Sequence, residues 1–349
     1  MTKYYTRVCN FYHGEESLKK LKSKKALPLN GNKSISFDTI EIISRKNNKK
    51  IFFKDIKFLQ KVQKIKVKND LKKITKKKIF KKLDLLQSPI LMGVLNLTPN
   101  SFSDGGRFNK KKKALSHIKE MVECGCKIVD IGGEATNPGS NDINETIEWK
   151  RIKSVLNEIK KKNYFISLDT RKSSIMKKGI NNKVSLINDV SGLTYDKKTL
   201  EVLKTTKIPF VIHHMQGTPK TMQKNPKYKN VILDIYDFFY SKIKEIRKAG
   251  INHNNIILDP GIGFGKNLKH NITLIRNISI FHSLGFPIML GISRKRFIKD
   301  ISENNDSKYR IGGTISSSLY AMMQGVQILR VHDINEINQS IKVFKSLKF

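Results

Sequence analysis

The sequence is short of several residue types, and each shortage argues against a class of protein. Its 349 residues include three cysteines, Cys9, Cys124 and Cys126, an odd number without repeated spacing. This argues against a disulfide framework and fits a reducing compartment. No stretch approaches the roughly 20 consecutive apolar residues of a membrane-spanning helix, and the first residues lack the apolar run of a secretory signal. We therefore expect a cytoplasmic protein with no membrane partner.

Acidic residues are also scarce. Against 29 Asp and Glu stand 68 Lys and Arg, which gives a formal net charge of +39. Such a charge is typical of proteins that bind nucleic acids. However, only 11 of the basic residues are arginines, the residue that direct base readout favours, and the lysines are spread over nearly every expected helix. We interpret the excess as solvated lysine-rich surface and expect no specific nucleic-acid partner.

The composition changes near residue 88. Residues 1–88 hold 25 Lys and Arg but only 7 Asp and Glu. Within them, segments 34–45 and 49–53 alternate like two strands joined by a turn, and the lysine-rich tract 61–86 predicts one or two short basic helices. We predict that residues 1–88 form a basic N-terminal extension. It is either a small α+β module packed on the rest of the chain or a partly disordered basic arm.

From residue 89 to residue 349, apolar strand candidates alternate with amphipathic helix candidates. Strands separated by helices predict a parallel sheet, because parallel strands need crossover connections. Eight such units in about 260 residues match a (β/α)8 barrel, the TIM barrel. An open doubly wound sheet is the alternative, but the GxGxxG turn typical of its first strand is missing. The expected strands are 90–97, 127–132, 164–169, 185–190, 208–215, 256–260, 287–293 and 328–333. The expected helices are 110–124, 145–162, 172–181, 196–205, 230–249, 267–284, 311–325 and 334–346.

Every expected strand has an apolar middle and a polar or charged C-terminal end. In a (β/α)8 barrel these ends and the loops after them share one face, where active sites lie. Charged groups there are costly to desolvate unless a ligand uses them, so the pattern predicts a single site. The polar strand ends supply Asn96, Thr98, Asp130, Glu134, Thr136, Asp169, Thr170, Asn188, Asp189, His213, His214, Asp259, Ser293, Arg294, Lys295, Arg330, His332 and Asp333, with Met215 beside them.

The chemistry of these side chains indicates a flat heterocycle and an anion. Asp169, Asn188 and Asp259 can accept hydrogen bonds from a ring rich in N–H groups. Lys295 can donate to such a ring, and Arg330 can lie on it and also reach a phosphate. The polar loop after residue 98 is suited to closing over the site and excluding water. His213 and His214 are neighbours on a strand and face opposite sides, which argues against a shared metal ion.

Eight motifs resemble, in chain order, the successive signatures of the dihydropteroate synthases, a family of pterin-binding barrels. They span roughly residues 89–349, and eight ordered motifs are far more specific than any one of them. Residues 1–88 resemble, more weakly, the extension of some alphaproteobacterial members. The motifs are MGVLNLTPNSFSDGG (92–106), VDIGGEATNPG (129–139), SLDTRK (167–172), INDVSG (187–192), HHMQGTP (213–219), LDPGIGFGK (258–266), GISRKRF (291–297) and RVHD (330–333).

The resemblance implies an enzyme that joins (7,8-dihydropterin-6-yl)methyl diphosphate to p-aminobenzoate, releasing pyrophosphate, with Mg²⁺ as cofactor and a homodimer as the usual assembly. It implies catalytic roles for Asp169, Asp259, Lys295, Arg330 and His332. Asn96 is the implied Mg²⁺ ligand and lies near the diphosphate. The other implied substrate-binding residues are Thr136 and Asn188 for the pterin, Asp104 and Thr136 for the cover over p-aminobenzoate, Met215 and Phe264 as apolar walls, and Arg296 near the p-aminobenzoate carboxylate.

Four positions depart from the family pattern: Asn100, which replaces a common Asp in the first loop, Ala135, Asn137 and Arg296. The second loop usually reads Ser-Thr-Arg-Pro-Gly, whereas this chain has Ala135-Thr136-Asn137-Pro138-Gly139 and so lacks a cation near the diphosphate. Arg296 stands where many members have serine. Two alternative functions follow from the sequence. One is another pterin-barrel activity, such as methyl transfer from a methylated folate. The other is an inactive, polyanion-binding barrel whose working part is residues 1–88.

Overall fold

The computed structural model describes residues 2–80, 83–98, 111–303 and 305–348, and eight parallel strands form its centre. The strands are β5 (Ile90–Asn96), β6 (Ile128–Gly132), β7 (Ile166–Asp169), β8 (Leu186–Asp189), β9 (Phe210–His213), β10 (Ile256–Asp259), β11 (Met289–Gly291) and β12 (Ile328–Val331). Their order in the sheet is β10-β9-β8-β7-β6-β5-β12-β11. A parallel bridge between Leu258 and Ile288 brings the two edges together. The predicted (β/α)8 barrel is therefore confirmed.

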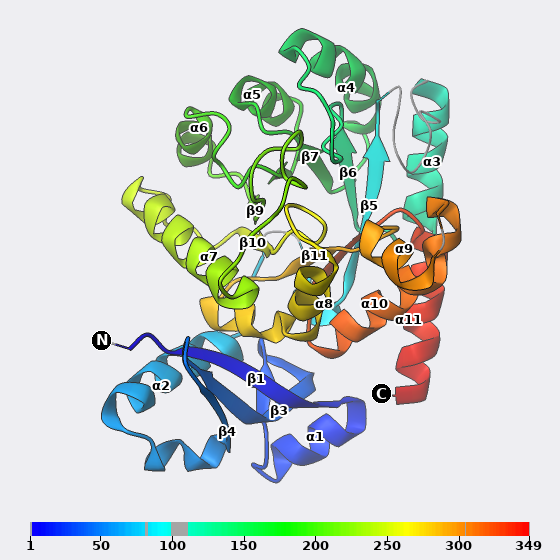
Figure 1. Ribbon diagram of the computed structural model, residues 1–349. Helices are drawn as coiled ribbons and strands as arrows, with labels where there is room; N and C mark the ends of the chain where they lie inside the picture. Colours follow the sequence, from blue (N-terminus) through cyan, green and yellow to red (C-terminus); the bar gives the residue numbers. More distant parts are fainter. Residues whose placement is uncertain (1, 81–82, 99–110, 304, 349) are drawn as a thin grey trace.

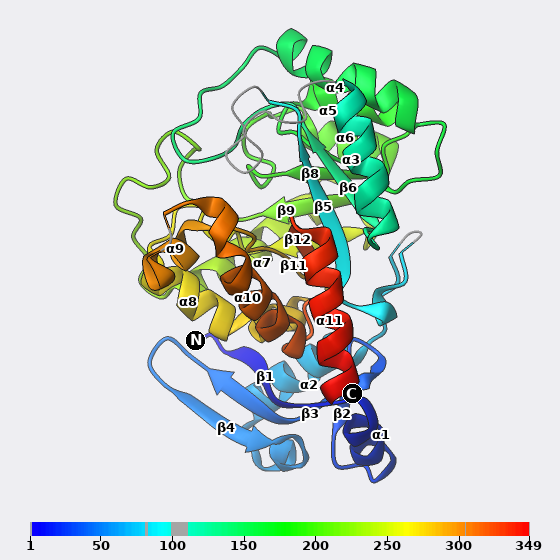
Figure 2. The ribbon, with the colours of Figure 1, turned by 90° about the vertical axis from the view of Figure 1, so that its right-hand side faces the viewer.

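Helices surround this barrel and follow the strands in turn (Figures 1 and 2). They are α3 (Lys111–Glu123), α4 (Glu145–Ile159), α5 (Ser173–Asn181), α6 (Thr199–Thr206), α7 (Val231–Lys248), α8 (Leu268–Arg276), η3 (Ile278–Leu284), α9 (Arg296–Ser302), η4 (Ser307–Arg310), α10 (Ile311–Met323) and α11 (Ile334–Lys348). Two details differ from the sequence prediction. The single helix expected over 267–284 is divided at Asn277, whose side chain bonds Thr273 O and accepts from Arg7. The short helices α9 and η4 were not expected.

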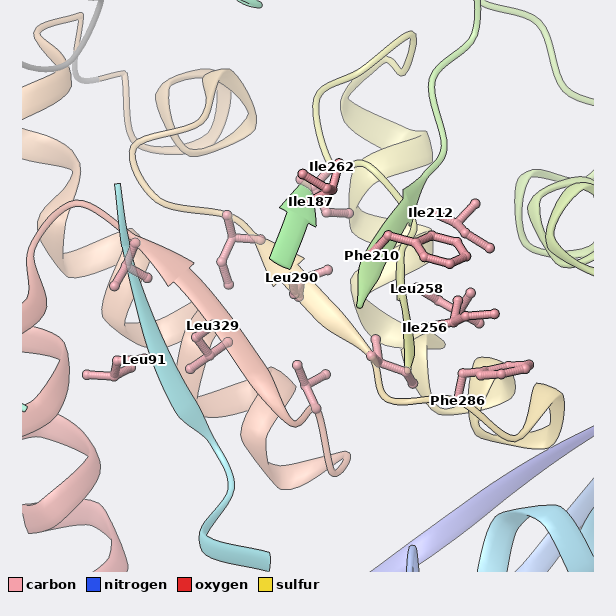
Figure 3. Packing of buried hydrophobic residues seen from close by; sticks show 14 of the residues in the cluster. Leu91, Ile187, Phe210, Ile212, Ile256, Leu258, Ile262, Phe286, Leu290 and Leu329 are labelled. Carbon is pink, nitrogen blue, oxygen red and sulfur yellow. The ribbon is translucent and has the colours of Figure 1, made fainter. Parts of the chain in front are cut away.

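The barrel strands bury different residues on their two faces, because successive side chains of a strand point to opposite sides. The outward-facing residues, such as Leu91, Ile212 and Leu329, belong to the large apolar cluster that continues into the helices (Figure 3). The inward-facing residues at the N-terminal ends form a second apolar cluster, which includes Ile128 and Ile328. This second cluster fills the end of the barrel opposite the polar strand ends.

Residues 2–80 form a small sheet with flanking helices. The strands β1 (Tyr5–His13), β2 (Leu27–Leu29) and β4 (Asn48–Phe52) all pair antiparallel with β3 (Asn32–Ile43). The helices are α1 (Gly14–Lys22), η1 (Phe53–Phe58) and α2 (Lys61–Thr75), and η2 (Leu85–Gln87) follows. The two predicted strands appear as β3 and β4, and α2 is a helix within the lysine-rich tract 61–86 that was predicted to be helical. The strands β1 and β2 and the helix α1 were not predicted.

This N-terminal sheet packs against the barrel rather than forming a loose arm. Tyr5 Oη donates to Asp237 Oδ2 on α7 at 2.9 Å, and Ser279 Oγ on η3 donates to Val8 O at 2.9 Å. The Tyr5 ring also meets the Tyr236 ring edge-on at 5.1 Å. Figure 1 places the sheet at the end of the barrel where β5 begins, opposite the polar strand ends. The domain division at residue 88 remains a prediction.

Candidate active site

Arg330, near the C-terminal end of β12, lies at the centre of the polar strand ends. Its Nε donates to Asp130 Oδ2 on β6 at 2.7 Å, and its Nη2 donates to Asp169 Oδ2 on β7 at 2.9 Å. Asn188 Nδ2 on β8 donates to the same Asp130 oxygen at 3.1 Å. Side chains from four strands therefore meet in one hydrogen-bonded group, which we call the Arg330 cluster: Asp130, Asp169, Asn188 and Arg330.

The period of two along each strand explains why this cluster forms. Ile128, Leu186 and Ile328 belong to the apolar cluster inside the barrel. The residue two positions after each of them faces the same way but lies closer to the open end. These residues are Asp130, Asn188 and Arg330. The apolar floor and the polar cluster are thus successive layers of one barrel interior.

Glycines leave room for other predicted site residues beside the cluster. A methyl group placed on Gly132 would lie 3.4 Å from Asp169 Cβ and 3.8 Å from Asn96 Oδ1. A methyl group placed on Gly291 would lie 3.9 Å from Asp259 Oδ2 and 3.9 Å from Arg330 Cβ. Asn96 and Asp259 therefore border the Arg330 cluster across these two glycines.

Lys295 is held beside the loop that follows β10. Its Nζ lies 4.2 Å from the centre of the Phe264 ring, a cation–π contact. The Phe264 ring packs edge-on against His213 at 4.5 Å, and His213 Nε2 lies 4.0 Å from Asp259 Oδ2. Lys295, Phe264, His213 and Asp259 therefore form a continuous wall of the site.

His332 and Ser293 complete the side of the barrel near β11 and β12. His332 Nδ1 lies 3.0 Å from Ser293 Oγ, and the His332 N–H also donates to that oxygen at 3.2 Å. These contacts fix the imidazole so that Nε2 remains for a ligand. His214 faces away from this site, since its ring packs edge-on against Phe238 on α7 at 4.9 Å. The expectation that the two adjacent histidines face opposite sides agrees with this arrangement.

Several buried acceptors of the site have no hydrogen-bond partner in the described residues. They are Asp130 Oδ1, Asp169 Oδ1 and Asn188 Oδ1. The hydroxyl of Thr98, at the start of the first loop, is also buried without a partner. Native proteins rarely leave such atoms unpaired, and each one costs free energy unless a donor is supplied. Three unpaired oxygens in one cluster suit a ligand that offers several N–H groups.

Burial in the barrel shifts the titration of the charged residues. It raises the pKa of Asp259 to about 6 and lowers the pKa of Lys295 to about 8. It lowers the pKa of His332 to about 3, with the positive charge of Arg330 as the next cause. Burial, followed by the nearby Asp130 carboxylate, raises the pKa of Asp169. Near neutral pH, His332 is therefore a neutral hydrogen-bonding group rather than a cation.

A buried ion-pair network, which we call the Lys172 network, lies at the base of the second loop. Lys172 Nζ contacts Glu134 at 2.8 Å and Glu148 at 2.6 Å, and Arg171 contacts Glu134 at 2.9 Å and Asp142 at 2.6 Å. Glu134 also accepts from the N–H of Ile143 at 3.0 Å. The network thus ties both ends of the 134–143 loop to the segment between β7 and α5. Arg171 and Lys172 belong to the motif SLDTRK, but no role was predicted for them from the sequence. The role of Glu134 was also left undecided.

The remaining predicted site residues lie outside these contacts. Thr136 is half-buried in the 134–143 loop, and Met215 is half-buried just after β9. The side chain of Arg296 is 76% exposed and lies 3.5 Å from Asp300, so the structure gives it no contact with the Arg330 cluster. Asp104 is outside the described residues. Asp130, which the sequence left ambiguous, is in contrast a central member of the cluster.

The described residues contain no group of three or more His, Cys, Asp or Glu side chains that could hold a metal ion. Asn96 offers a single amide oxygen near Asp169, across Gly132. Mg²⁺ commonly keeps several waters and binds through one or two protein oxygens together with substrate phosphates. The donor set of the described residues therefore fits a magnesium ion brought with a phosphorylated substrate.

Comparisons with known proteins show the family to which the chain belongs. Residues 92–332 match the family described as pterin binding enzyme, which leaves the first 91 residues unmatched. A dihydropteroate synthase of Haemophilus influenzae is 39% identical over 262 residues, covering 75% of this chain and 94% of that protein. The enzyme of Neisseria meningitidis serogroup B is 39% identical over 268 residues, covering 75% of this chain and 94% of that protein.

Solved structures extend the likeness to three dimensions. The Yersinia pestis dihydropteroate synthase with a sulfonamide drug complex superposes with a TM-score of 0.73 at 37% identity, covering 76% of this chain and 96% of that one. The Xanthomonas albilineans dihydropteroate synthase with 4-aminobenzoic acid superposes with a TM-score of 0.70 at 31% identity, covering 76% of this chain and 94% of that one. Fold, ordered motifs and relatives agree, and the chain belongs to the pterin binding enzyme family and, within it, to the dihydropteroate synthases.

Proposed function

We propose that the chain joins (7,8-dihydropterin-6-yl)methyl diphosphate to p-aminobenzoate, forming 7,8-dihydropteroate and pyrophosphate. The observation that carries this proposal is the Arg330 cluster, in which buried, unpaired acceptors surround a guanidinium at the open end of the barrel. A pterin supplies the ring N–H donors for those acceptors, and its diphosphate supplies the anion. Neighbouring structures in complex with 4-aminobenzoic acid or a sulfonamide support the second substrate.

The pterin ring lies between the acceptors and Lys295 in this proposal. Asn188 and Asp259 accept hydrogen bonds from ring and amino N–H groups, and Lys295 donates to the ring carbonyl or a ring nitrogen. Asp169 accepts a further N–H through its unpaired Oδ1, while its Oδ2 keeps Arg330 in place. Phe264, held against Lys295 and His213, forms an apolar wall on the ring. This arrangement selects a flat, donor-rich heterocycle over an apolar ring.

In the reaction, the bond between the methylene carbon and the diphosphate oxygen breaks, and both electrons leave with the diphosphate. Arg330 stabilises the developing negative charge electrostatically, while neutral His332 donates a hydrogen bond from Nε2. The Asp259 carboxylate stabilises positive charge that spreads from the methylene into the ring. The p-aminobenzoate nitrogen then forms the new C–N bond and loses its proton to solvent. Asn96 is the proposed ligand of a Mg²⁺ ion, which when bound supplies further charge neutralisation at the diphosphate.

The proposal is tested by following pyrophosphate release from the purified protein with both substrates and Mg²⁺. We expect release that depends on p-aminobenzoate and that stops when either substrate is omitted. Thr136 and the first-loop residue Asp104 are the proposed cover for p-aminobenzoate, Met215 is a proposed apolar wall, and Arg296 is proposed to lie near the p-aminobenzoate carboxylate. Pyrophosphate release that does not change when p-aminobenzoate is withheld would contradict the proposed reaction and indicate simple hydrolysis.

The assembly and compartment are also part of the proposal. A homodimer is the expected assembly, and the exposed apolar residues Tyr320 on α10 and Val343 and Leu347 on α11 are candidates for its interface. Light scattering should give about twice the chain mass of 40.1 kDa. The three cysteines are free thiols, which supports a reducing, cytoplasmic compartment. No helix in the described part of the chain has the length and apolar character needed to cross a membrane.

A further inference from the structure

The positive charge of the chain is concentrated in one segment of the N-terminal sheet. Residues 46–80 contain 14 lysines, no arginine and two acidic residues, a net charge of +12. Nearly a third of the net charge of +39 therefore falls in a tenth of the chain. A general drift toward lysine across the whole sequence does not explain this concentration. The segment includes β4, η1 and α2, none of which contributes to the Arg330 cluster.

Large apolar side chains are exposed in the same segment. Phe58 at the end of η1 is 76% exposed, and Val62 and Ile65 in the first turns of α2 are 53% and 54% exposed. Val62 and Ile65 are three positions apart, so they are neighbours on one face of the helix. The buried apolar residues of α2, Val67 and Ile74, pack into the apolar cluster of the sheet instead. The three exposed side chains are therefore outside the core of this module.

Lysines surround these exposed apolar side chains. Lys54 and Lys57 on η1 and Lys61 and Lys68 on α2 are all exposed. Lys57 Nζ lies 4.9 Å from the centre of the Phe58 ring, and Lys64 Nζ donates to Lys57 O at 2.9 Å, which joins η1 to α2. We call this surface the basic corner: Lys54, Lys57, Phe58, Lys61, Val62, Ile65 and Lys68. Figure 1 places α2 at the end of the molecule away from the open end of the barrel.

We propose that the basic corner docks the enzyme on the surface of an anionic lipid bilayer, which replaces the expectation from the sequence that the chain has no membrane partner. Peripheral membrane binding needs apolar side chains that enter the headgroup boundary and lysines that meet anionic lipids, and the corner has both. Each lysine near such a surface adds to the attraction, and lysine stems reach across apolar surface while their charge stays in water. The barrel mouth then faces away from the membrane and remains open to substrates.

Nucleic acid is the competing polyanion, and the side chains of the corner favour lipid over it. Val62 and Ile65 are aliphatic and offer no ring on which a base can stack, whereas single-strand binders rely on aromatic stacking. The corner also lacks arginine, which supplies many phosphate and base contacts in nucleic-acid complexes. Insertion of apolar side chains into a bilayer uses both the aromatic and the aliphatic members of the surface.

The test is sedimentation of the full chain with vesicles at about 0.15 M salt, where weak long-range attraction is screened. One vesicle set is phosphatidylcholine alone, and the other contains about one-third phosphatidylglycerol to supply the anionic surface. We expect binding to the anionic vesicles only. The triple variant F58S/V62S/I65S should bind about tenfold or more weaker, because it loses the apolar insertion. All three positions are exposed, so melting temperature and pyrophosphate release should remain as in the unmodified chain.

A matched charge control separates the corner from nonspecific stickiness. Replacing Lys57, Lys61 and Lys68 by Gln should weaken binding about tenfold or more, whereas the same change at the exposed Lys160, Lys161 and Lys162 should alter it less than about twofold. Equal effects of the two sets would overturn the proposal. The proposal would also be overturned if F58S/V62S/I65S bound anionic vesicles as tightly as the unmodified chain. It would be overturned as well if the chain bound a single-stranded RNA and this triple variant weakened that binding.

Fluorescence gives a second, independent readout. The chain has one tryptophan, Trp149 on α4, so W149F removes the background signal and F58W places the probe in the corner. Anionic vesicles should shift the emission of F58W to shorter wavelength, because the indole leaves water for the headgroup boundary. An emission maximum that stays fixed while the protein sediments with vesicles would contradict insertion and overturn the proposed docking mode.

Discussion

Replacing Lys172 by methionine should strongly destabilise the fold, although Lys172 is not among the residues proposed to contact substrate. The ammonium lies between Glu134 and Glu148, and the three side chains are only 5%, 3% and 0% exposed. Removing it leaves two buried carboxylates without their shared cation. Removing one partner of a buried ion pair costs about 3–5 kcal/mol. Arg171 still contacts Glu134, and Thr170 still donates to Glu148 at 2.6 Å, so we expect the lower end, about 3 kcal/mol.

The stability lost in K172M should depend on pH. The direction of that dependence identifies the uncompensated carboxylates as the cause. Burial already raises the pKa of Glu148 in the unmodified chain, and removal of Lys172 raises it further. A carboxyl whose folded pKa is raised binds its proton more tightly in the folded state than in the unfolded state. Its folded form is therefore relatively most stable at low pH, and stability falls as pH rises toward the folded pKa. The difference between K172M and the unmodified chain should shrink from about pH 8 to about pH 5.5.

Urea unfolding followed by circular dichroism at several pH values measures both effects. K153M is the matched control, because Lys153 is exposed on the neighbouring helix α4, and its loss should change stability by less than about 0.5 kcal/mol. A cost for K172M below about 1 kcal/mol would refute the reasoning, since the network would then add little. A large cost that is identical at every pH would also refute it, because the uncompensated carboxylates would not be its source.

Three further predictions concern the site and the N-terminal sheet. D259N should lower kcat/KM for the pterin substrate about 100-fold through loss of a charged acceptor while leaving the melting temperature nearly unchanged, with the exposed-residue change D300N as control. A pH profile of kcat/KM should rise through about pH 6 as Asp259 ionises and fall above about pH 8 as Lys295 loses its proton, and a flat profile would contradict both roles. Y5F should cost about 1 kcal/mol in thermal unfolding without changing pyrophosphate release, because only the hydrogen bond to Asp237 is lost.

The sequence predicted the barrel well because each element carries its own signal. Short, mainly apolar segments such as 128–132 and 256–259 are too short for amphipathic helices, and each carries a polar residue at or near its end, Asp130 or Asp259. All eight strands were therefore found, with their ends shifted by a few residues. The N-terminal sheet was harder to predict. The strand β1 reads YTRVCNFYH, and Arg7 on it is satisfied by Glu41 and Asn277, partners that no local pattern reveals.

Prediction of the candidate site from the sequence is likewise limited to residues whose position follows from the fold. Asn188, Arg330 and Asp169 were predicted from their places at strand ends, which requires only the fold. The role of Asp130 depends on Arg330, which is 200 positions away in the chain. The Lys172 network likewise joins the segment between β7 and α5 to Glu134 in the second loop and to Glu148 on α4. Sequence reasoning finds residues that lie on one face, and it does not find which of them pair, because pairing depends on distances set by the closed barrel.

The pairing within the Arg330 cluster couples recognition of the two ends of the proposed pterin substrate. Arg330 is held by two carboxylates, Asp130 and Asp169, so the three side chains together carry a net negative charge when both are ionised. If Arg330 turns toward a diphosphate, these carboxylates lose donors in a buried setting, which is costly. A ring that supplies N–H groups to the same acceptors offsets that loss. A diphosphate without the pterin lacks this compensation, and a pterin without the diphosphate leaves Arg330 on its carboxylates. The Arg330 cluster, which the alternation of the strands places above the apolar cluster of the barrel, should therefore bind the intact substrate better than either of its parts.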